Sequence, residues 1–590
     1  MIRKGGSFLF EDVPATEVFS PEDFSEEHVM IIKTTEGFIR NEVVPHDKAI
    51  ELQDFDLTRR LMRQAGELGL LGVDIEEKYG GCRMDSIASL LIVEHSAAAG
   101  SFGVALNVQS GIGSMPLVFF GNEAQKEKYL PSLARGEKIG AYALTEPGAG
   151  TDALSIATTA MLSPDGKYYV LNGAKQFITN GGIADIIFTY AKVDGDKFTA
   201  FVVERGFEGV STGPEEKKLG IRGTSTCSIF FDGARVPVEN VVYAIGRGHI
   251  VAFNILNLGR FKLAAGSVGV AKLALASAVG YTRERVQFGK PVCKFGLMKH
   301  KIAEMATRIY MAESMVYRTG GLIDRILTTL DRNAKDAGGQ SAGSIAEYAI
   351  ECSMNKVYCS EMLAYVADET LQMYGGYGYI EDYPAERIYR DCRIFRIFEG
   401  TNEINRVIIL GWLMRKALKN EIPFFNTVEK LRNELAELEP LSPAAGDEAL
   451  GYQKRIVDRA KKIFLTLCDN AVQKYGTDIE QEQEVMGLLS DIAIEVYAME
   501  SGLLRAFKAV EAGGVRQSRI KMVMVQLYVN DAMLRIGHRA RQILAAMDEG
   551  NTLASKLALL QKISHFTPVN GVKLRRDIAG EIIEAGRYVC

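Results

Sequence analysis

The sequence predicts an α+β protein that is mostly helical, with one β domain in its middle. The chain has 590 residues, far more than one compact core usually organises, so several domains are expected. Apolar residues recur at helical spacing before about residue 140 and again after about residue 249. Between these regions lie short runs rich in β-branched and aromatic residues, separated by Pro-Asp-Gly and Asp-Gly turns, which is typical of antiparallel strands. We therefore expect an N-terminal helical domain, a middle antiparallel β domain, a C-terminal helical bundle and an additional C-terminal helical domain.

The N-terminal helical domain is expected over residues 25–139, after a tail of residues 1–24. Ser20 is followed by a proline and two acidic residues, which is the pattern of an N-cap with proline at the first helical position. Helical structure is predicted to begin there. Apolar spacing then predicts helices over residues 56–68 and 86–98.

The β domain is expected over residues 140–245, and a C-terminal helical bundle over residues 246–418. The predicted strands span residues 167–171, 186–193, 198–203 and 228–231. The predicted helices of the bundle span residues 262–285, 297–325 and 344–374. Residues 337–343 are interpreted as a flexible connection.

A further boundary is predicted near Pro423, and the additional helical domain is expected over residues 419–590. Within it Ile456, Ile463 and Leu467 form an apolar stripe. The basic residues around this stripe are Lys454, Arg455, Arg459, Lys461 and Lys462. A core-facing helix with a solvated basic face explains the pattern, and a weak peripheral contact with an anionic membrane is the alternative.

Bulk properties exclude several classes of function. The net charge of −5 and the pI near 6.0 give no global basic field, so nucleic acid is not expected as a partner. Eight cysteines are scattered without metal-ligand spacing, which is typical of a reducing compartment and predicts no metal site. The N-terminal residues lack the apolar core of a signal peptide, and no run looks long and apolar enough to span a bilayer. We therefore expect a soluble cytoplasmic protein.

A catalytic base is predicted at Glu399, in the stretch RIFEGTN at residues 396–402. Apolar neighbours such as Phe398 disfavour the charged carboxylate and raise its pKa, which makes it a better proton acceptor near neutrality. Gly400 has no side chain that would block a ligand, and Thr401 or the asparagine after it can N-cap the helix that follows. On these residues alone, a capped helix after a turn is the simpler explanation.

Four glycine-rich or polar signatures stand at the seams between the predicted domains. They are AYALTEPGAGTD at 141–152, QFITNGG at 176–182, ERVQFGKP at 284–291 and QMYGGYGY at 372–379. The first contains a GxGxx(G/A) match from Gly148, but Pro147 sits where a strand should feed the turn and no βαβ unit follows, so a Rossmann site is rejected. Its glycines still let backbone N–H groups approach a ligand, and Thr145 and Thr151 add hydroxyl donors. A β-turn and two helix C-caps explain the other three nearly as well.

Taken together and in this order, these motifs resemble the acyl-CoA dehydrogenase family. The resemblance runs over most of the chain and is carried by GLLG at 69–72, EKYGG at 77–81, TEPG at 145–148, ITNG at 178–181, KLGIRGT at 218–224, RVQFG at 285–289, Gly375-Gly376 and EGT at 399–401. After residue 418 the chain resembles the extra helical domain of the large, very-long-chain members, and the absence of a leader fits their bacterial counterparts. The resemblance implies that the middle domain is a β-barrel and that residues 246–418 form a four-helix bundle.

The resemblance also implies a reaction. In this family a base removes the α-proton of an acyl-CoA thioester while the β-hydrogen leaves as hydride to FAD, which gives the trans-2-enoyl-CoA. Carried across by motif, Glu399 is that base. Some relatives place the base just before Arg260, where this chain has Gly259 and so offers no rival carboxylate. The resemblance assigns polarisation of the thioester carbonyl to the Glu399 backbone N–H and a ribityl hydroxyl of FAD.

Binding residues follow from the same resemblance. FAD is expected to contact Tyr142, Leu144, Thr145, Gly150, Thr151, Phe177, Thr179, Thr401 and Glu403. Arg285, Phe288, Gln372, Gly375 and Gly376 are expected to reach the FAD bound mainly by another subunit, which implies a homodimer. Acyl-CoA is expected to contact Thr151, Asn257, Arg260 and Gly400.

Two positions depart from the family pattern, because Phe177 replaces a tryptophan beside the flavin and Asn257 replaces an acid of medium-chain members. Val104 and Val108, in a predicted helix over 103–114, stand where polar side chains close the acyl pocket in medium-chain relatives. We therefore expect a long-chain acyl-CoA as substrate in fatty acid β-oxidation, with electrons passed to an electron-transfer flavoprotein. A branched, aromatic or sulfur-containing acyl-CoA is the alternative substrate. An assembly or scaffold role, like that of one large relative, is the alternative function.

Overall fold

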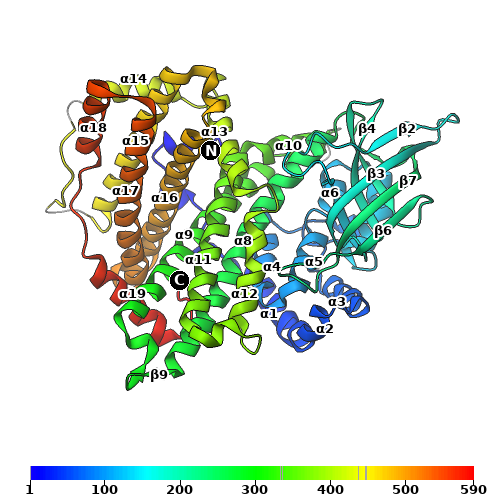
Figure 1. Ribbon diagram of the computed structural model, residues 1–590, viewed down its shortest axis with the longest axis horizontal. Helices are drawn as coiled ribbons and strands as arrows, with labels where there is room; N and C mark the ends of the chain where they lie inside the picture. The colour runs from blue at the N-terminus through cyan, green and yellow to red at the C-terminus, as the bar shows by residue number, and fades with distance from the viewer. Residues whose placement is uncertain (1, 332–333, 335, 436–437, 445–447) are drawn as a thin grey trace.

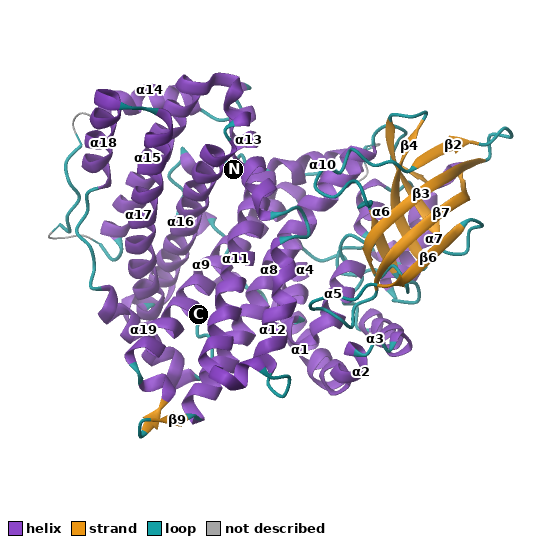
Figure 2. Cartoon of the chain, viewed as in Figure 1, coloured by secondary structure: helices purple, strands orange, loops and turns teal. Residues whose placement is uncertain are grey.

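The computed structural model describes residues 2–331, 334, 336–435, 438–444 and 448–590. Figure 1 shows a β domain at one end of the molecule, a group of long helices in the centre and a second group of long helices at the other end. The strands are gathered almost entirely in the one end domain (Figure 2). The predicted mostly helical α+β architecture is confirmed.

The N-terminal domain is built from short helices. The helices are α1 (Glu26–Phe38), α2 (Asp47–Glu51), α3 (Phe55–Glu67), α4 (Ser86–His95), α5 (Gly100–Gln109), α6 (Met115–Phe120) and α7 (Glu123–Ala134). Of these, α1, α3, α4 and α7 each begin at a capping side chain. Asp54 Oδ1 accepts from the Leu57 N–H at 2.9 Å, and Asn122 Oδ1 accepts from the Gln125 N–H at 2.9 Å.

The segment before α1 is not a loose tail. Phe8 and Leu9 are buried in the main hydrophobic core, and the Gly6 N–H donates to Glu351 Oε1 at 2.7 Å. The Ser20 cap starts only one 3-10 turn, Pro21–Asp23, and the first α-helix begins at Glu26. The helix start predicted at Ser20 was therefore wrong by several residues, because the chain turns extended again at Phe24.

The middle domain is one eight-stranded sheet in the order β6-β7-β3-β2-β4-β5-β8, with β1 added beside β4. Most pairings are antiparallel, but β1 and β2 both run parallel to β4. The longest pairing joins β3 and β7. The length of each of these strands is set by its pairing with the other strand rather than by its own local sequence. The strands are β1 (Gly140–Ala143), β2 (Thr159–Leu162), β3 (Tyr168–Thr179), β4 (Ile186–Val193), β5 (Lys197–Glu204), β6 (Val210–Glu215), β7 (Thr226–Pro237) and β8 (Val241–Val242).

The central helices form the bundle that carries Glu399. They are α8 (Gly248–Glu284), α9 (Gly296–Leu327), α10 (Ala337–Glu347), α11 (Ala349–Tyr374), α12 (Pro384–Cys392) and α13 (Asn402–Leu418), with the small hairpin β9 (Val286–Gln287) and β10 (Lys290–Pro291) between α8 and α9. Residues 337–343, predicted as a flexible connection, belong to α10 instead. A β-carbon on Gly338 would lie 1.9 Å from the Phe119 carbonyl oxygen, so the small residues serve close packing of α10 on α6 rather than flexibility.

Helix α8 is long and apolar enough, by length and composition, to cross a membrane, and the bent pair of residues 86–95 and 97–109 also passes this test. The expectation that no run meets this criterion was therefore wrong. In the fold, α8 packs against α4, α9 and α11 and most of its apolar window is buried. Its apolar character is that of a core helix in the bundle.

The last part of the chain is a second helical group that packs on the bundle through α16 against α9 and α13, and through α19 against α9. Buried ion pairs join the two groups, with Arg318 Nη2 to Glu500 Oε2 at 2.7 Å and Arg505 Nη1 to Glu313 Oε2 at 2.5 Å. Its helices are α14 (Phe424–Leu435), α15 (Gly451–Tyr475), α16 (Gln483–Gln517), α17 (Arg519–Met547), α18 (Gly550–Ser564) and α19 (Gly571–Ala585).

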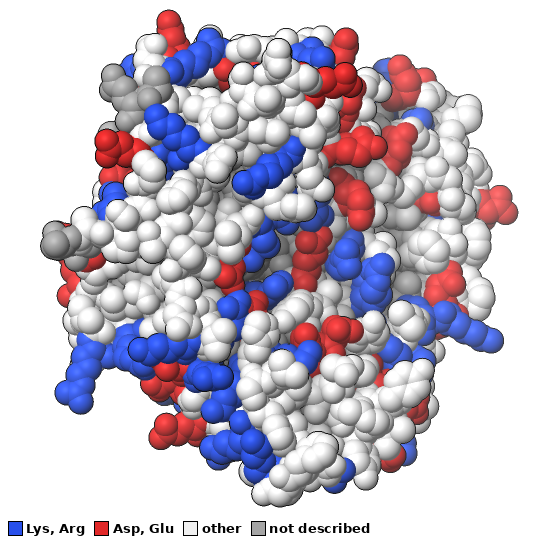
Figure 3. All heavy atoms as spheres, turned by 60° about the vertical axis from the view of Figure 1, so that its left-hand side comes forward, with Lys and Arg blue, Asp and Glu red and all other residues white. Residues whose placement is uncertain are grey.

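The basic face predicted on α15 is mostly occupied by contacts within the chain. Lys461 and Arg459 are buried, with Lys461 paired to Glu500 and Arg459 donating to the Glu439 carbonyl at 2.7 Å. Lys454 pairs with Asp12 at 2.9 Å, Lys462 pairs with Glu434 at 2.7 Å, and Arg455 donates to the Ser442 carbonyl at 3.1 Å. The apolar stripe does face the core, but the basic face is not a freely solvated one. On the face drawn in Figure 3, basic and acidic side chains are interspersed.

Candidate active site

Glu399 lies in a sharply turned loop just before α13. The backbone φ is +58° at Glu399 and +81° at Gly400, so two consecutive residues adopt the left-handed conformation. That conformation is costly for a glutamate and persists only where surrounding contacts hold it. Thr401 ends the loop as the N-cap of α13, and its hydroxyl accepts from the Ile404 N–H at 3.3 Å. The loop therefore aims the Glu399 side chain in one direction.

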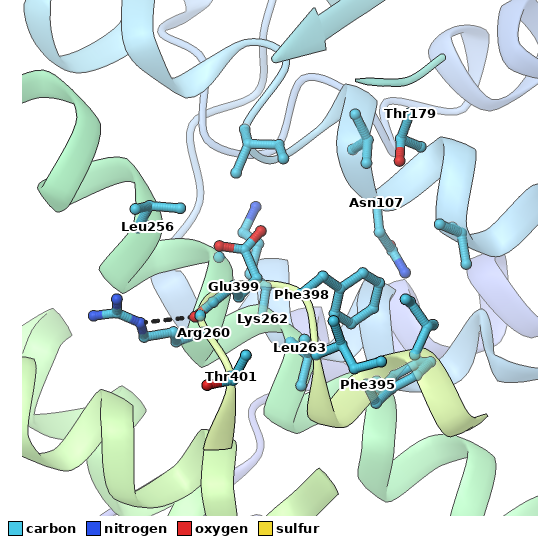
Figure 4. A pocket seen from close by; sticks show the side chains of 18 of the residues that line it. Asn107, Thr179, Leu256, Arg260, Lys262, Leu263, Phe395, Phe398, Glu399 and Thr401 are labelled. Carbon is cyan, nitrogen blue, oxygen red and sulfur yellow. Dashed lines mark hydrogen bonds between the residues drawn. The ribbon is translucent and has the colours of Figure 1, made fainter. Parts of the chain in front are cut away.

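The Glu399 carboxylate points into a cavity (Figure 4). The side chain is half-buried, and its Oε2 is a buried atom with no hydrogen-bond partner among the described residues. Burial raises the pKa of Glu399 to about 7, while the positive charges of Arg260 and Lys356 oppose part of this rise. An acid with a free buried oxygen and a pKa near neutrality is suited to accept a proton.

Gly259 on α8 provides the space for this carboxylate. A β-carbon on Gly259 would lie 2.4 Å from Glu399 Oε2, so any side chain there collides with the Glu399 carboxylate. The sequence identified Gly259 only as a position without a rival acid. The structure adds that the two positions are in direct contact.

Of two residues expected at acyl-CoA, Arg260 contacts the Glu399 loop and Asn257 contacts Arg260. The Arg260 Nε–H donates to the Glu399 carbonyl at 3.1 Å, as the dashed line in Figure 4 marks, and Arg260 Nη1 donates to Asn257 Oδ1 at 2.9 Å. Both side chains line the cavity as well. Their contacts within the chain make them supports of the loop, and a contact with CoA stays a prediction.

Three further residues that hold the Glu399 loop around its Gly400 carbonyl were not identified from the sequence as supports of the loop. Lys356 Nζ on α11 donates to the Gly400 carbonyl at 2.7 Å and to Asn402 Oδ1 at 2.6 Å. Asn405 Nδ2 donates to the same Gly400 carbonyl at 2.9 Å. The available signals were a lysine inside an apolar helix and two asparagines within four residues after EGT.

The cavity has a volume of about 2010 Å³ and lies between the β domain, α5, α8 and α13. Its β-domain wall is formed by residues from the ends of β1 and β3 and the loop after β1. Those predicted to contact FAD are Tyr142, Leu144, Thr145, Gly150, Thr151, Phe177 and Thr179, and all of them line the cavity. Phe177 has a φ of +59° and is 58% exposed, so it is a cavity wall and not a core residue.

A buried ion pair fixes the loop after β1. Lys175 Nζ on β3 lies 2.6 Å from Glu146 Oε1, and Lys175 is fully buried. Glu146 also accepts from the backbone N–H groups of Ala157 at 2.5 Å and Thr158 at 3.2 Å. Burial lowers the pKa of Lys175 to about 8, and the Glu146 charge opposes this fall. The loop was identified from the sequence, but the Lys175–Glu146 ion pair that fixes its conformation was not.

The β-domain wall fits a flavin ring. It combines threonine hydroxyls, an aromatic face at Phe177 and a glycine loop in which a β-carbon on Gly148 or Gly150 would meet no atom within 4 Å. This open backbone can approach a planar or anionic group closely. Glu399 faces this wall across the cavity, so a substrate bound between them would meet both (Figure 4).

Thr401, also predicted to contact FAD, lines the cavity as well, but six other predicted FAD residues lie elsewhere. Arg285, Phe288, Gln372, Gly375, Gly376 and Glu403 do not line the cavity of the described chain. Arg285 and Phe288 lie beside the β9–β10 hairpin, at the edge of the molecule in Figure 1. Arg285 stacks over Tyr377 at 5.7 Å, and Phe288 is 93% exposed. Within one chain Arg285, Phe288 and the segment 372–376 lie apart from the cavity, while Glu403 is exposed in the first turn of α13.

The acyl end of the cavity is lined mainly by apolar side chains from α5 and α8. Val104 and Val108 on α5 and Leu263 and Val270 on α8 are among the lining residues. Asn107 is a polar exception, and its Oδ1 is buried without a partner in the described chain. The helix predicted over 103–114 is α5, which ends at Gln109.

Family models match the chain in four places: acyl-CoA dehydrogenase, N-terminal domain, at residues 25–137; middle domain at 141–234; and two C-terminal domain models at 246–414 and 459–562. The chain is 50% identical over 587 residues to a probable acyl-CoA dehydrogenase of Bacillus subtilis (strain 168), which covers 100% of this chain and 98% of that protein. It is 37% identical over 493 residues to the mitochondrial very long-chain specific acyl-CoA dehydrogenase of Bos taurus, over 78% of this chain and 71% of that protein.

A crystal structure of an acyl-CoA dehydrogenase complexed with FAD from Bacillus anthracis superposes with a TM-score of 0.97 at 49% sequence identity, over 100% of both chains. The fold, the cavity with its free acid and these four domain matches agree with one another. The chain belongs to the acyl-CoA dehydrogenase family of FAD-dependent oxidoreductases.

Proposed function

We propose that this protein oxidises long-chain acyl-CoA thioesters to trans-2-enoyl-CoA in fatty acid β-oxidation, with Glu399 as the base. The observation that carries the proposal is the Glu399 carboxylate, which lies at the cavity wall with one buried oxygen free and a pKa raised to about 7. Such a carboxylate can accept a proton from a carbon acid at neutral pH without first breaking a strong hydrogen bond.

Glu399 takes the α-proton of the thioester, and the electron pair left on the α-carbon forms the new double bond as the β-hydrogen departs with its own electron pair. FAD, when bound against the β-domain wall, supplies the acceptor for that hydride. Glu399 keeps the proton until the product has left. The apolar cavity wall excludes water, which strengthens the electrostatic interactions of the reacting groups.

The loop also offers a donor for the thioester carbonyl. The Glu399 backbone N–H has no acceptor within the described part of the chain, and the left-handed turn at Glu399 and Gly400 fixes its direction. A fixed donor at a developing oxyanion contributes about 3 to 4 kcal/mol in comparable sites. Polarisation by this N–H makes the α-proton acidic enough for Glu399.

The apolar extension of the cavity supports a long acyl chain. Leu273 on α8 lines the cavity 14 positions after Gly259, which corresponds to about 21 Å along a helix. Val104 and Val108 leave this end open where polar side chains would close it. The matched very long-chain specific relative supports the same substrate class.

Two partners are part of the proposal. Electrons leave to an electron-transfer flavoprotein, and a second copy of the chain brings the Arg285 and Gly375 cluster to the FAD of its neighbour. The exposed Phe288 and the separation of this cluster from the chain's own cavity support a homodimer. We place the protein in the cytoplasm.

Anaerobic titration of the purified holoprotein with palmitoyl-CoA tests the proposal. We expect bleaching of the flavin absorbance band and formation of trans-2-hexadecenoyl-CoA, with turnover restored by electron-transfer flavoprotein. A series from butyryl-CoA to stearoyl-CoA, together with a branched and an aromatic acyl-CoA, identifies the preferred chain. Absence of bleaching with every thioester would favour an assembly role over an enzymatic one.

A further inference from the structure

A chain of polar contacts, partly exposed at its outer end and buried at its inner end, runs from the extra C-terminal helical domain to the loop that carries Glu399. It starts at Asp491 on α16 and ends at the carbonyl of Gly400. Its members come from α16, α13 and α11, three helices far apart in the sequence. The proposed oxidation of acyl-CoA requires none of these residues to contact the substrate. We therefore look for their role in the way they hold the loop.

The first half of the chain crosses the boundary between the two helical groups. Asp491 Oδ1 accepts from Arg406 Nε at 2.8 Å. Arg406 then forms a two-pronged pair with Glu361 on α11, with Nη1 to Oε1 at 2.9 Å and Nη2 to Oε2 at 3.0 Å. The Ser490 hydroxyl donates to the Arg406 carbonyl at 2.6 Å, so α16 contacts both the side chain and the backbone of Arg406. Paired geometry of this kind is specific in direction as well as strong.

The second half reaches the loop. Glu361 Oε1 accepts from Asn402 Nδ2 at 3.0 Å, which fixes the orientation of the amide. The opposite side of that amide, Oδ1, accepts from Lys356 Nζ at 2.6 Å, and Lys356 Nζ also donates to the Gly400 carbonyl at 2.7 Å. Each donor thus meets an acceptor all the way from Asp491 to Gly400.

Burial makes the inner members of this chain dependent on one another. Lys356 is fully buried and Asn402 is 1% exposed, so neither can replace a lost partner with bulk water. A buried polar group left without a partner carries a large desolvation cost. If Asn402 turned, Lys356 would lose one acceptor and its hold on the left-handed turn at Gly400 would weaken.

We infer that Lys356 and Asn402 are positioning residues for Glu399, and that the extra C-terminal domain keeps them in place through Asp491 and Arg406. The inference rests on the proposed function of Glu399 as the base. The extra domain therefore supports the Glu399 loop in addition to packing on the bundle.

The charges around Glu399 give this inference a distinct signature. Arg260 on α8, Lys356 on α11 and Tyr142 on β1 face Glu399, while Lys262 on α8 pairs with Asp74 at 2.9 Å. The positive charge of Lys356 lowers the pKa of Glu399 against the effect of burial. Loss of Lys356 must therefore raise that pKa further, in addition to loosening the loop.

Lys356 itself is surrounded by charges of both signs. Burial lowers the pKa of Lys356 to about 7, the carboxylates of Glu399, Glu403 and Glu361 oppose this fall, and Arg260 adds to it. The two hydrogen bonds to oxygen atoms further favour the ammonium form.

The test at the far end of the chain compares Asp491→Asn with Asp531→Asn in the full-length holoprotein. Both carboxylates lie in the same charged cavity between α16, α17 and the bundle, and their side chains are 21% and 23% exposed. Asp531 pairs with Arg575 and does not touch Arg406, so it is a matched control. Amide hydrogen exchange of residues 396–405 is measured first, and we expect faster exchange in Asp491→Asn alone.

The second measurement isolates proton transfer. A palmitoyl-CoA analogue with sulfur in place of C3 has no β-hydrogen to lose as hydride, but its α-protons can still exchange with deuterated water. We expect Asp491→Asn to slow this exchange about fivefold at saturating analogue, with little change in KM, as remote members of a coupled network do. Asp531→Asn should stay within about twofold of the wild type.

At the near end, Lys356→Met removes the charge at similar length. We expect the rate of α-proton exchange to fall about a hundredfold, as for a misplaced catalytic group. We also expect the acidic limb of the pH–rate profile of this exchange to move to higher pH. A role for Lys356 in packing alone would lower the rate without moving the limb.

Equal loop protection in Asp491→Asn and Asp531→Asn, or an unmoved limb in Lys356→Met, would overturn the inference. If instead the wild type exchanges the α-proton of no acyl-CoA analogue, the proposed function fails. The amide exchange of the loop still decides the inference in that case, because it needs no substrate.

Discussion

Gly259 and Glu399 lie in direct contact at the cavity wall, since a β-carbon on Gly259 would stand 2.4 Å from Glu399 Oε2. The Glu399 carboxylate can occupy this position only because α8 has no side chain at residue 259.

Gly259→Ala should displace the Glu399 carboxylate and lower the rate of flavin reduction by about a hundredfold, because a shift of about 1 Å is enough to spoil a proton transfer. FAD content should be unchanged. The control is Gly280→Ala on the same helix, where a β-carbon meets nothing within 4 Å. Stopped-flow bleaching compares the two, and equal rates would show that the carboxylate adapts freely.

Glu399→Gln should retain FAD and lose about 10² to 10⁴ in the rate of flavin reduction, the usual contribution of a general base. The amide keeps the size of the side chain, so a loss of rate reports the missing proton acceptor. Full activity in this variant would place the base on another residue.

The same substitution should stabilise the fold at alkaline pH. The pKa of Glu399 rises from an ordinary value of 4.5 to about 7 on folding, so the folded state binds its proton more tightly than the unfolded state. The stability from this proton is fully present below about pH 4.5 and is lost as pH rises through about 7. At about pH 8, Glu399→Gln should therefore be more stable than the wild type by about 1 to 3 kcal/mol, measured by urea unfolding of both apoproteins. No difference between about pH 5 and about pH 8 would contradict the raised pKa.

Flavin reduction should speed up as pH rises through about 7, because only the ionised Glu399 accepts a proton. Single-turnover bleaching with palmitoyl-CoA from about pH 5.5 to about pH 9 should show one ionisation on the acidic side. A rate that does not change over this range would mean that another step limits bleaching.

Val108→Glu should close the apolar end of the cavity and place an unpaired charge against it. We expect kcat/KM for palmitoyl-CoA to fall at least about tenfold more than that for hexanoyl-CoA, since burying an unpaired polar group is costly. Val108→Ala keeps the cavity open and serves as the control. An equal loss for both thioesters would show that the long chain leaves the cavity by another route.

Lys175→Met should destabilise the protein by about 3 to 5 kcal/mol, because it leaves the Glu146 carboxylate buried without its partner. The loop after β1 should loosen and FAD should dissociate more readily. Lys197→Met breaks the exposed pair with Asp194 and should leave the stability almost unchanged, because solvent screens the pair. Chemical unfolding and flavin release measure the two effects, and similar stabilities would rule out a structural role for the buried pair.

Sequence reasoning reached furthest where the signal is local. The EGT stretch marked Glu399, the glycine loop marked Thr145 and Thr151, and the order of motifs along the chain indicated the family. These features depend on residues adjacent in sequence, so turn chemistry, helix caps and desolvation by neighbours are readable without a fold. The same local reasoning failed at residues 337–343, where glycines that read as flexible are required by the close approach of Phe119.

By itself, the sequence predicted Glu399 as the base and the residues of the flavin wall through motifs that resemble the family, and it predicted the division into helical and β regions through short-range periodicity. Only the tertiary structure decided that Gly259 clears the space for Glu399, that Lys175 neutralises Glu146, and that Lys356 holds the turn at Gly400. It also decided that the extra domain reaches this turn through Asp491. The physical reason is that a buried charge is stable only beside a specific partner, and packing brings that partner from a distant part of the chain.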